Sequence, residues 1–186
     1  AAMLAATPLT RAYVNNGGDI ALHLAPGASY RAAIAGLDGQ VSGQITISAG
    51  DGIGGIATSG QGGRSLSLGI ATSVTVLARD AATADAAATL IANAVDLPGH
   101  PAITRRPARD LHPDSDLGAR PVVTHVGPLA RAEVSAALAA GAARAQKLID
   151  SGTIAAAALI LQGQGVTVGT FADRAMARTE RSLQHA

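Results

Sequence analysis

The pattern of apolar and polar residues in the first half of the chain is typical of strands joined by tight turns. Alternating apolar positions indicate strands, and paired small residues between them indicate turns. Gly17 and Gly18 mark one such turn, between the first two strands. The strands predicted in this half lie in residues 11–16, 20–25, 41–49 and 65–78, and the last run is long enough for one or two strands.

Two segments show helical spacing instead. After Asp80 or Thr83, either of which can cap a helix, apolar residues recur with the period of one helical face and end before Pro98. Residues 130–150 predict a second, longer helix that is closed by Gly152. The chain therefore combines helices with the strands of its first half.

The remaining segments predict a loop, a strand, a hairpin and a tail. Residues 98–120 carry several prolines among charged residues and predict a long irregular loop. Residues 121–127 read as a strand, and residues 154–171 read as a hairpin that turns at Gln162–Gly165. The tail, residues 170–186, is weakly helical, and we expect it to be peripheral.

This order of elements predicts the fold class. Strands and helices do not alternate strictly, and short glycine turns join several strands, so we predict an α+β fold with a largely antiparallel, glycine-rich sheet and packed helices. The 186 residues suit a single domain over residues 1–186. The chain has no initiating Met and opens like the end of a helix, so we expect an N-terminal part to be missing.

Composition narrows the classes of function. Hydrophobic residues make up 48% of the chain and aromatic residues only 2%, so the core must be built from small aliphatic side chains. With so few aromatic rings to stack on bases, we expect no nucleic-acid partner. No apolar run reaches the length of a membrane span, so we expect none. A cytoplasmic location is favoured, although the sequence leaves the location unknown.

The glycine-rich residues 50–65 carry the first candidate chemistry. Residues 50–55 fit the dinucleotide pattern G-x-G-x-x-G, but the segment that follows has too many helix breakers to open the required helix. Exposed backbone N–H groups here could form an anion-binding nest, with Thr58 and Ser59 as hydroxyl donors and Arg64 as a charge. A glycine-rich hairpin with bulges is the alternative.

Three further polar clusters can likewise be interpreted either as a functional site or as ordinary structure. Asp85 and Thr89 stand one turn apart on the first predicted helix, a spacing that suits Mg²⁺ and equally suits a plain surface pair. Asn16 and Asp19 flank the glycine pair, where a ligand can approach the backbone, although a tight turn explains these residues as well. The alternating cluster Asp110-x-His112-x-Asp114-x-Asp116 could bind a metal if it is extended, but a solvated loop is favoured.

Three of these segments together resemble a known family. NNGGDI at 15–20, GIATSG at 55–60 and SVTVLARDAATADAAATLIANA at 73–94 resemble, in order and content, the GGD, ATSG and AD-x-x-x-T elements of the ApbE-like superfamily, the relatives of FAD:protein FMN transferase. The match covers roughly the first half of the chain, and the second half looks like an uncharacterised branch of that superfamily.

The resemblance implies a site and a reaction. In the transferases, Mg²⁺ lies on the FAD pyrophosphate, and FMN passes to a threonine of an acceptor protein. Carried over to this sequence, the metal ligands would be Asp85, Thr89 and a backbone carbonyl near Ala57. The residues expected to line the FAD or FMN site are Asn16, Gly17, Gly18, Asp19, Thr58, Ser59, Gly60 and Arg64.

The chain departs from the transferases at one point. They carry an insertion with a histidine and an Asp-Pro element after ATSG, which is absent here, so no catalytic residue is assigned. We expect a Mg²⁺-dependent protein that binds flavin or another nucleotide and acts at the FAD pyrophosphate, by FMN transfer or hydrolysis. The alternatives are a non-catalytic ligand-binding protein and a different small-molecule enzyme on the same scaffold. A homo-oligomer is left open.

Overall fold

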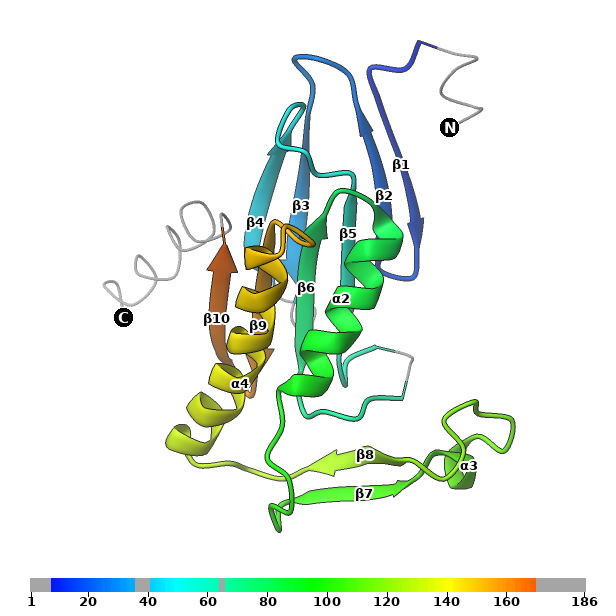
Figure 1. Cartoon of the computed structure of the whole chain (residues 1–186), viewed down its shortest axis with the longest axis vertical. Coiled ribbons are helices and arrows are strands. Elements are labelled where there is room, and N and C mark those ends of the chain that lie inside the picture. Colours follow the sequence, from blue (N-terminus) through cyan, green and yellow to red (C-terminus); the bar gives the residue numbers. More distant parts are fainter. Residues whose placement is uncertain (1–7, 36–40, 64–65, 170–186) are drawn as a thin grey trace.

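The computed structural model describes residues 8–35, 41–63 and 66–169 and has the predicted α+β fold (Figure 1). Its centre is a six-stranded sheet in the order β1-β2-β5-β6-β9-β10, in which every neighbouring pair is antiparallel. The strands of this sheet are β1 (Arg11–Asn16), β2 (Asp19–Leu24), β5 (Gly55–Ser59), β6 (Ser73–Ala78), β9 (Ala156–Leu161) and β10 (Gln164–Gly169).

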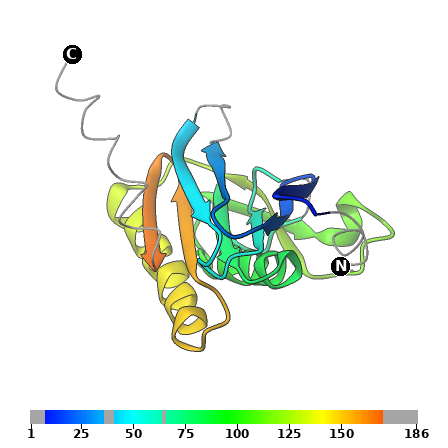
Figure 2. The same ribbon diagram turned by 90° about the horizontal axis from the view of Figure 1, so that it is seen from above.

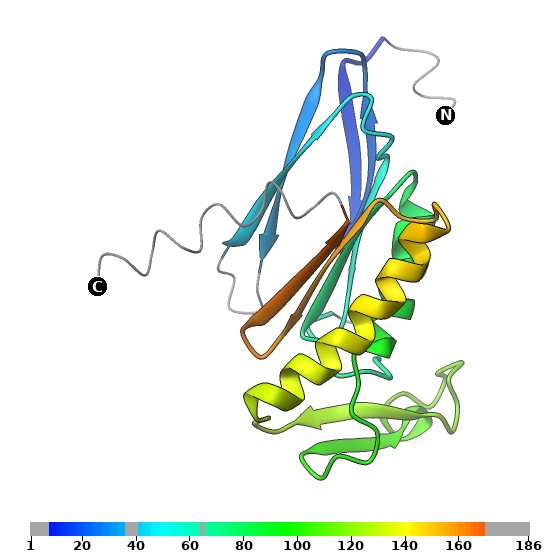
Figure 3. The same cartoon turned by 60° about the vertical axis from the view of Figure 1, so that its left-hand side comes forward.

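The sheet is covered on its two faces by different elements. The helices α2 (Ala81–Ala94) and α4 (Arg131–Asp150) lie on one face. The hairpin of β3 (Ser29–Ala35) and β4 (Val41–Ser48) lies on the other. Figures 2 and 3 show these three layers from two further directions. We call the two faces of the sheet the helix face and the hairpin face.

A second hairpin lies beyond one end of the sheet. The strands β7 (Ile103–Pro107) and β8 (Pro121–Val126), with the short helix α3 (Ala108–Leu111), run crosswise to the sheet in Figure 1. An ion pair between Arg105 and Asp96 connects β7 to the segment after α2. His100 Nε2 lies 3.0 Å from Glu133 Oε1 at the start of α4. The pKa of Glu133 is lowered mainly by the hydrogen bond with His100 and next by the hydrogen bond from the Ala130 N–H.

Several predicted elements are confirmed. The first helix begins after Asp80, whose carboxylate caps it, and the second helix and the last hairpin lie where expected. The irregular loop predicted over residues 98–120 is wrong in part, because β7 and α3 lie within it. The sequence analysis also missed β3 and β5, and β6 is shorter than predicted. The tail over residues 170–186 lies outside the described residues.

Alternation along the strands divides the core into two parts. On the helix face, Ala57, Val74 and Val76 pack with α2 and α4. On the hairpin face, Ile56 and Leu77 pack with the β3–β4 hairpin. These core side chains are aliphatic, as the composition requires, so close packing must supply the dispersion energy that large aromatic rings supply in other proteins.

Glycines at the layer contacts let backbones approach each other closely. A Cβ atom on Gly55 would overlap the backbone of Asp80 and Ala81 at the start of α2. A Cβ atom on Gly141 of α4 would lie 2.7 Å from Leu159 Cδ2 in β9. At the other end of α2, a Cβ atom on Gly69 would overlap the Ala92 carbonyl. Gly55 and Gly141 thus allow the helices to lie close to the sheet, and Gly69 allows the segment before β6 to lie close to the end of α2.

No helix in the described part of the chain has both the length and the apolar character that are needed to cross a membrane.

We expect Gly55→Ala to destabilise the protein by about 1–3 kcal/mol or more, because the added methyl group meets backbone that cannot move aside. Urea unfolding measures this change. Gly165→Ala is the matched control: the nearest atom to its added Cβ is the Leu159 carbonyl oxygen at 3.5 Å, an ordinary contact. Equal losses in the two variants would contradict the proposed role of Gly55.

Candidate functional site

The turn between β1 and β2 sets the position of the first two candidate residues. Gly17 and Gly18 have φ angles of 66° and 114°, which favour glycine. The Gly18 N–H donates to Asn15 Oδ1 at 3.1 Å. Asn16 and Asp19 lie opposite each other in the ladder, so their side chains point to the same face of the sheet.

That face is the one that α2 covers. Ile20 packs on the hairpin face, so Asp19 next to it lies on the helix face. Partial burial and, second, the negative charge of Asp85 raise the pKa of the Asp19 carboxyl. The carboxylates of β2 and α2, which are 66 positions apart in the sequence, therefore lie close enough to repel each other.

The capped start of α2 fixes where Asp85 lies. Asp80 Oδ1 accepts the Thr83 N–H at 2.8 Å, and Asp80 Oδ2 accepts the Thr83 hydroxyl at 3.0 Å. The pKa of Asp80 is lowered mainly by the hydrogen bond from the Thr83 N–H and next by the one from the Thr83 hydroxyl. Asp85 follows in the second turn and Thr89 one turn later, and both side chains are exposed. The helix thus presents a carboxylate and a hydroxyl beside the β1–β2 turn.

Three N–H groups of the glycine-rich loop after β5, where an anion-binding nest is expected, donate to carbonyls of the protein itself. The N–H groups of Gln61, Gly62 and Gly63 donate to the carbonyls of Ala71, Thr72 and Gly60 at 2.9, 3.1 and 3.0 Å. These donors are used in continuing the β5–β6 hairpin, so they are not free to bind an anion. The alternative, a glycine-rich hairpin, is the one observed. Arg64 lies outside the described residues.

Thr58 and Ser59 point to opposite faces of the sheet. Thr58 lies on the hairpin face, where its hydroxyl is 2.9 Å from that of Thr75. Ser59 lies opposite Val74, which belongs to the core of the helix face. The Ser59 side chain therefore shares a face with Asp19 and Asp85, whereas the Thr58 hydroxyl does not.

The carbonyl of Ala57 is turned away from the acidic pair. The Leu22 N–H donates to the Gly54 carbonyl at 2.8 Å, so the even-numbered residues of β5 turn their backbone groups toward β2. Ala57, an odd-numbered residue that is fully buried, lies opposite Val76 and turns toward β6. The position expected of Ala57 as a metal ligand is thus not supported by the alternation of the strand.

Gly60 has a structural reason to be glycine. Its φ angle is 129°, and a Cβ atom there would lie 2.8 Å from the Thr72 carbonyl oxygen. The position therefore serves the close approach of the two ends of the β5–β6 connection.

The structure brings together four of the candidate residues and adds one relation that the sequence analysis missed. Asn16, Asp19, Asp85 and Thr89 belong to neighbouring elements on the helix face. The sequence analysis assigned Asp19 to the nucleotide and Asp85 to the metal, and did not pair them. The signal that could have paired them is the alternation after the two-glycine turn, which places Asp19 on the face that a helix must cover.

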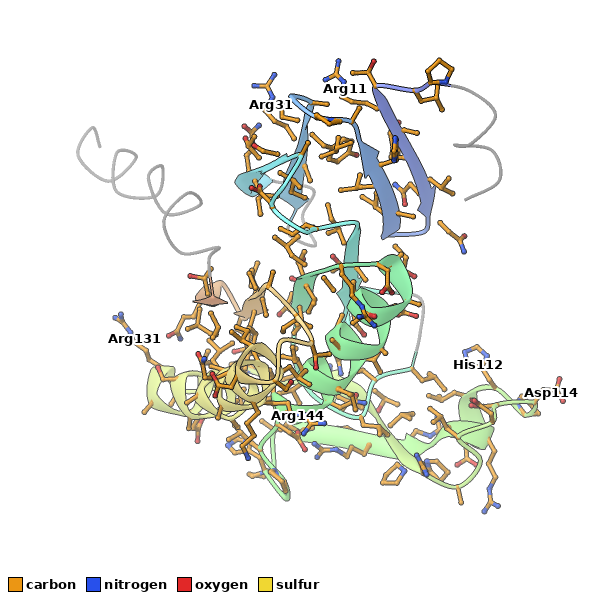
Figure 4. All side chains as sticks on the ribbon, turned by 45° about the horizontal axis from the view of Figure 1, so that its top comes forward. Arg11, Arg31, His112, Asp114, Arg131 and Arg144 are labelled. Carbon is orange, nitrogen blue, oxygen red and sulfur yellow. The ribbon has the colours of Figure 1, made fainter. Side chains whose placement is uncertain are left out.

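The alternating cluster around His112 remains a loop. His112, Asp114 and Asp116 follow α3, and all three side chains are exposed. Figure 4 shows His112 and Asp114 at the outer end of the β7–β8 hairpin. Among residues 8–35, 41–63 and 66–169, no three side chains of His, Cys, Asp or Glu are arranged to hold a metal. The acidic pair of Asp19 and Asp85 is therefore the better-supported candidate site.

The fold and the site define an α+β protein with an acidic pair at a sheet–helix junction. A family model described as "AbpE bacteria" matches residues 1–167, so the chain belongs to this family. No curated protein matches the chain. The assignment to the ApbE-like superfamily of flavin transferases is wrong, because the model that matches is not one of that superfamily. Its motifs here are short, and Gly17, Gly18 and Gly55 have structural roles of their own.

We expect Asp19→Asn to raise the free energy of unfolding of the ligand-free protein at pH 7, by no more than about 1 kcal/mol because solvent screens partly exposed charges. A carboxyl whose folded pKa is raised costs stability once it ionises, and Asn mimics its neutral form. The gain should therefore vanish as the pH falls below the ordinary value of 3.8.

Urea unfolding in EDTA at pH 7, 5 and 3.5 measures this difference. Asp114→Asn, which changes an exposed aspartate after α3, is the control and should show no such gain. A loss of stability in Asp19→Asn at pH 7 would mean that the Asp19 carboxylate makes favourable contacts, against the repulsion described here.

Proposed function

We propose that this protein binds Mg²⁺ between Asp19 and Asp85 and, through the ion, the phosphate groups of a nucleotide. The observation that carries the proposal is the placement of the two carboxylates: Asp19 of β2 and Asp85 of α2 lie on the same face of the sheet, and the charge of Asp85 adds to burial in raising the pKa of Asp19. Two like charges at one place cost free energy in the ligand-free protein, and a divalent cation removes that cost.

The kind of ligands favours Mg²⁺ over a transition metal. The chain has no cysteine, and the pair offers carboxylate oxygens with the Thr89 hydroxyl one turn away from Asp85. Mg²⁺ prefers oxygen and takes only one or two carboxylates, while water and phosphate fill the rest of its octahedron. A site with two acidic ligands and no third suits this pattern.

Backbone oxygen is the remaining protein ligand type to consider. The pairing of β2 with β5 ends at Ile20 and Ile56, so the next inward-turning residue of β5 is Thr58. Its carbonyl turns toward the β1–β2 turn and lacks a β2 partner in the ladder. The Thr58 carbonyl is therefore the backbone oxygen that this proposal assigns to the ion.

Phosphate is the ligand that the surroundings of the ion favour. Two carboxylates repel a free anion, so phosphate binds there only together with the cation. A Cβ atom on Gly18 would meet nothing within 4 Å, so the turn is open to a ligand. The Asn16 amide and the Ser59 hydroxyl supply neutral hydrogen-bond donors on the same face. FAD and FMN are suitable nucleotides for a test, since each carries phosphate.

Binding is better supported than cleavage or transfer at the FAD pyrophosphate. Pyrophosphate chemistry gains most from a site that excludes water, whereas Asp85 and Thr89 are exposed. The second candidate function, FMN transfer or hydrolysis at the pyrophosphate, would require the ligand or an acceptor protein to cover this face. The release of FMN or AMP from FAD in the presence of Mg²⁺ tests it directly.

We expect FAD to bind in Mg²⁺ and to lose at least about tenfold in affinity in EDTA, a change of about 1.4 kcal/mol. Asp85→Asn keeps the shape of the side chain and removes its charge, so it should abolish this dependence on the cation. Calorimetric titration of FAD into both proteins, with Mg²⁺ and with EDTA, measures the affinities.

Asp114→Asn serves as the matched control and should bind like the wild type, because Asp114 follows α3 at the far hairpin (Figure 4). Thermal unfolding in EDTA checks that Asp85→Asn is folded. Equal affinity of the wild type in Mg²⁺ and in EDTA would overturn the proposal, as would unaltered cation dependence in Asp85→Asn.

A further inference from the structure

Strand β1 is an edge of the central sheet, and its outer side has the features of an interaction surface. The sheet order places β1 at one edge and β10 at the other. β1 pairs with β2 over all six of its residues without a bulge. It contains no proline, lysine or acidic residue, which are the usual means of blocking an edge.

The backbone groups of three residues in β1 turn outward. The Ala25 N–H donates to the Thr10 carbonyl at 3.0 Å, so even-numbered residues of this segment turn toward β2. The backbone alternates along an antiparallel strand. Arg11, Tyr13 and Asn15 therefore direct their N–H and C=O groups away from the sheet, where another strand can pair with them.

Apolar side chains gather on the same strand. Within the described residues, the exposed large hydrophobic side chains are Tyr13, Val14 and Leu90, with exposed fractions of 61%, 67% and 46%. Two of these three are neighbours in β1. The Tyr13 ring also packs against Tyr30 of β3, with a centroid distance of 5.6 Å. Both tyrosines of the chain thus lie at this edge, and tyrosine is enriched in protein interfaces.

We propose that β1 pairs antiparallel with β1 of a second copy of this chain, about a two-fold axis that passes midway between Tyr13 and the partner's Tyr13. Such an axis is perpendicular to the sheet, so the helix faces of the two copies lie on the same side. Odd-numbered residues of one β1 must therefore lie opposite odd-numbered residues of the other, and even-numbered opposite even-numbered. With Tyr13 opposite the partner's Tyr13, Arg11 lies opposite the partner's Asn15 and Asn15 lies opposite the partner's Arg11. A shift by two residues in either direction leaves outward groups unpaired, so this register is the one that uses all three.

The charges of β1 also suit a second copy. Arg11 is its single charged residue and lies at its end. In the Tyr13-centred register the two Arg11 residues stand four positions apart along the strands, roughly 13 Å at about 3.3 Å per residue. That distance exceeds the Debye length of about 8 Å at physiological salt, so their repulsion is weak. An in-register parallel pairing would instead place the two arginines side by side.

The other edge is less suited to pairing. None of the exposed large hydrophobic side chains of the described residues lies on β10. Val166 and Val168 of β10 pack against the helix-face core instead. The inference therefore concerns β1 alone and predicts a continuous twelve-stranded sheet across the two copies, from twice the six strands of one.

Sedimentation velocity of the full 186-residue chain tests this pairing. The wild type should have twice the monomer mass, and Tyr13→Lys should halve that mass at the same concentration, because a charged side chain at the centre of the interface blocks it. Leu90→Lys is the matched control, since it places the same charge at the exposed hydrophobic residue on α2 and should leave the dimer intact. A monomeric wild type, or a dimeric Tyr13→Lys, would overturn the proposal.

Amide hydrogen exchange of the wild type gives a second readout that needs no variant. The Tyr13 and Asn15 N–H groups should be protected, and their protection should fall on dilution as the dimer dissociates. Protection that is independent of concentration in a monomer would mean that another segment of the same chain occupies the edge, and would also overturn the proposal.

Discussion

The contact between the start of α2 and strand β5 is made backbone against backbone, and the helix-face layer depends on it. A Cβ atom on Gly55 would overlap the Asp80 carbonyl, so any other residue would push the helix away from the sheet. With aromatic residues at 2% of the chain, the core has few large side chains to fill the space that would open. The helix must therefore lie close to the sheet, and its buried face must consist mainly of alanine.

The same contact determines the geometry of the candidate site. Asp80 belongs to the backbone that rests on Gly55, and its carboxylate also caps α2 through Thr83. The first turn of the helix is thus fixed both in position and in rotation. Because Asp85 follows by five residues, its direction toward β2 is set before any contact of its own side chain. Asp19 meets it because β2 begins at that residue, directly after the two-glycine turn.

Features that depend on neighbouring residues could be predicted from the sequence, whereas features that depend on the pairing of distant segments could not. The period of α2, its cap at Asp80 and the Gly17–Gly18 turn are set by neighbouring residues, and each could be predicted. Strand β5 could not, because its glycine looks like a breaker until the helix that needs the space is known. Strand β7 could not be predicted for a related reason. Ile103 pairs with a residue of β8, and Arg105 forms an ion pair with Asp96 after α2, so both partners lie outside the local segment.

The candidate site shows the same division. Asp85 and Thr89 could be chosen from their helical spacing, but the pairing of Asp85 with Asp19 depends on the sheet order β1-β2-β5, which no local pattern contains. Thr58 and Ser59 looked equivalent in sequence, and only the register with β6 separates their faces. The glycine-rich loop could not be interpreted from sequence either, because a run of glycines does not reveal which N–H groups the hairpin itself uses, as those of Gln61, Gly62 and Gly63 are used here.

The electrostatics of this site also limit what it can bind. Burial first, and the charge of Asp85 second, raise the pKa of the Asp19 carboxyl, whereas hydrogen-bond donors lower the pKa of Asp80 and of Glu133. Repulsion between two like charges favours binding of a cation and opposes binding of a bare anion. The proposed binding of phosphate through Mg²⁺ is consistent with this charge pattern, because the cation would remove the repulsion between the carboxylates and the anion.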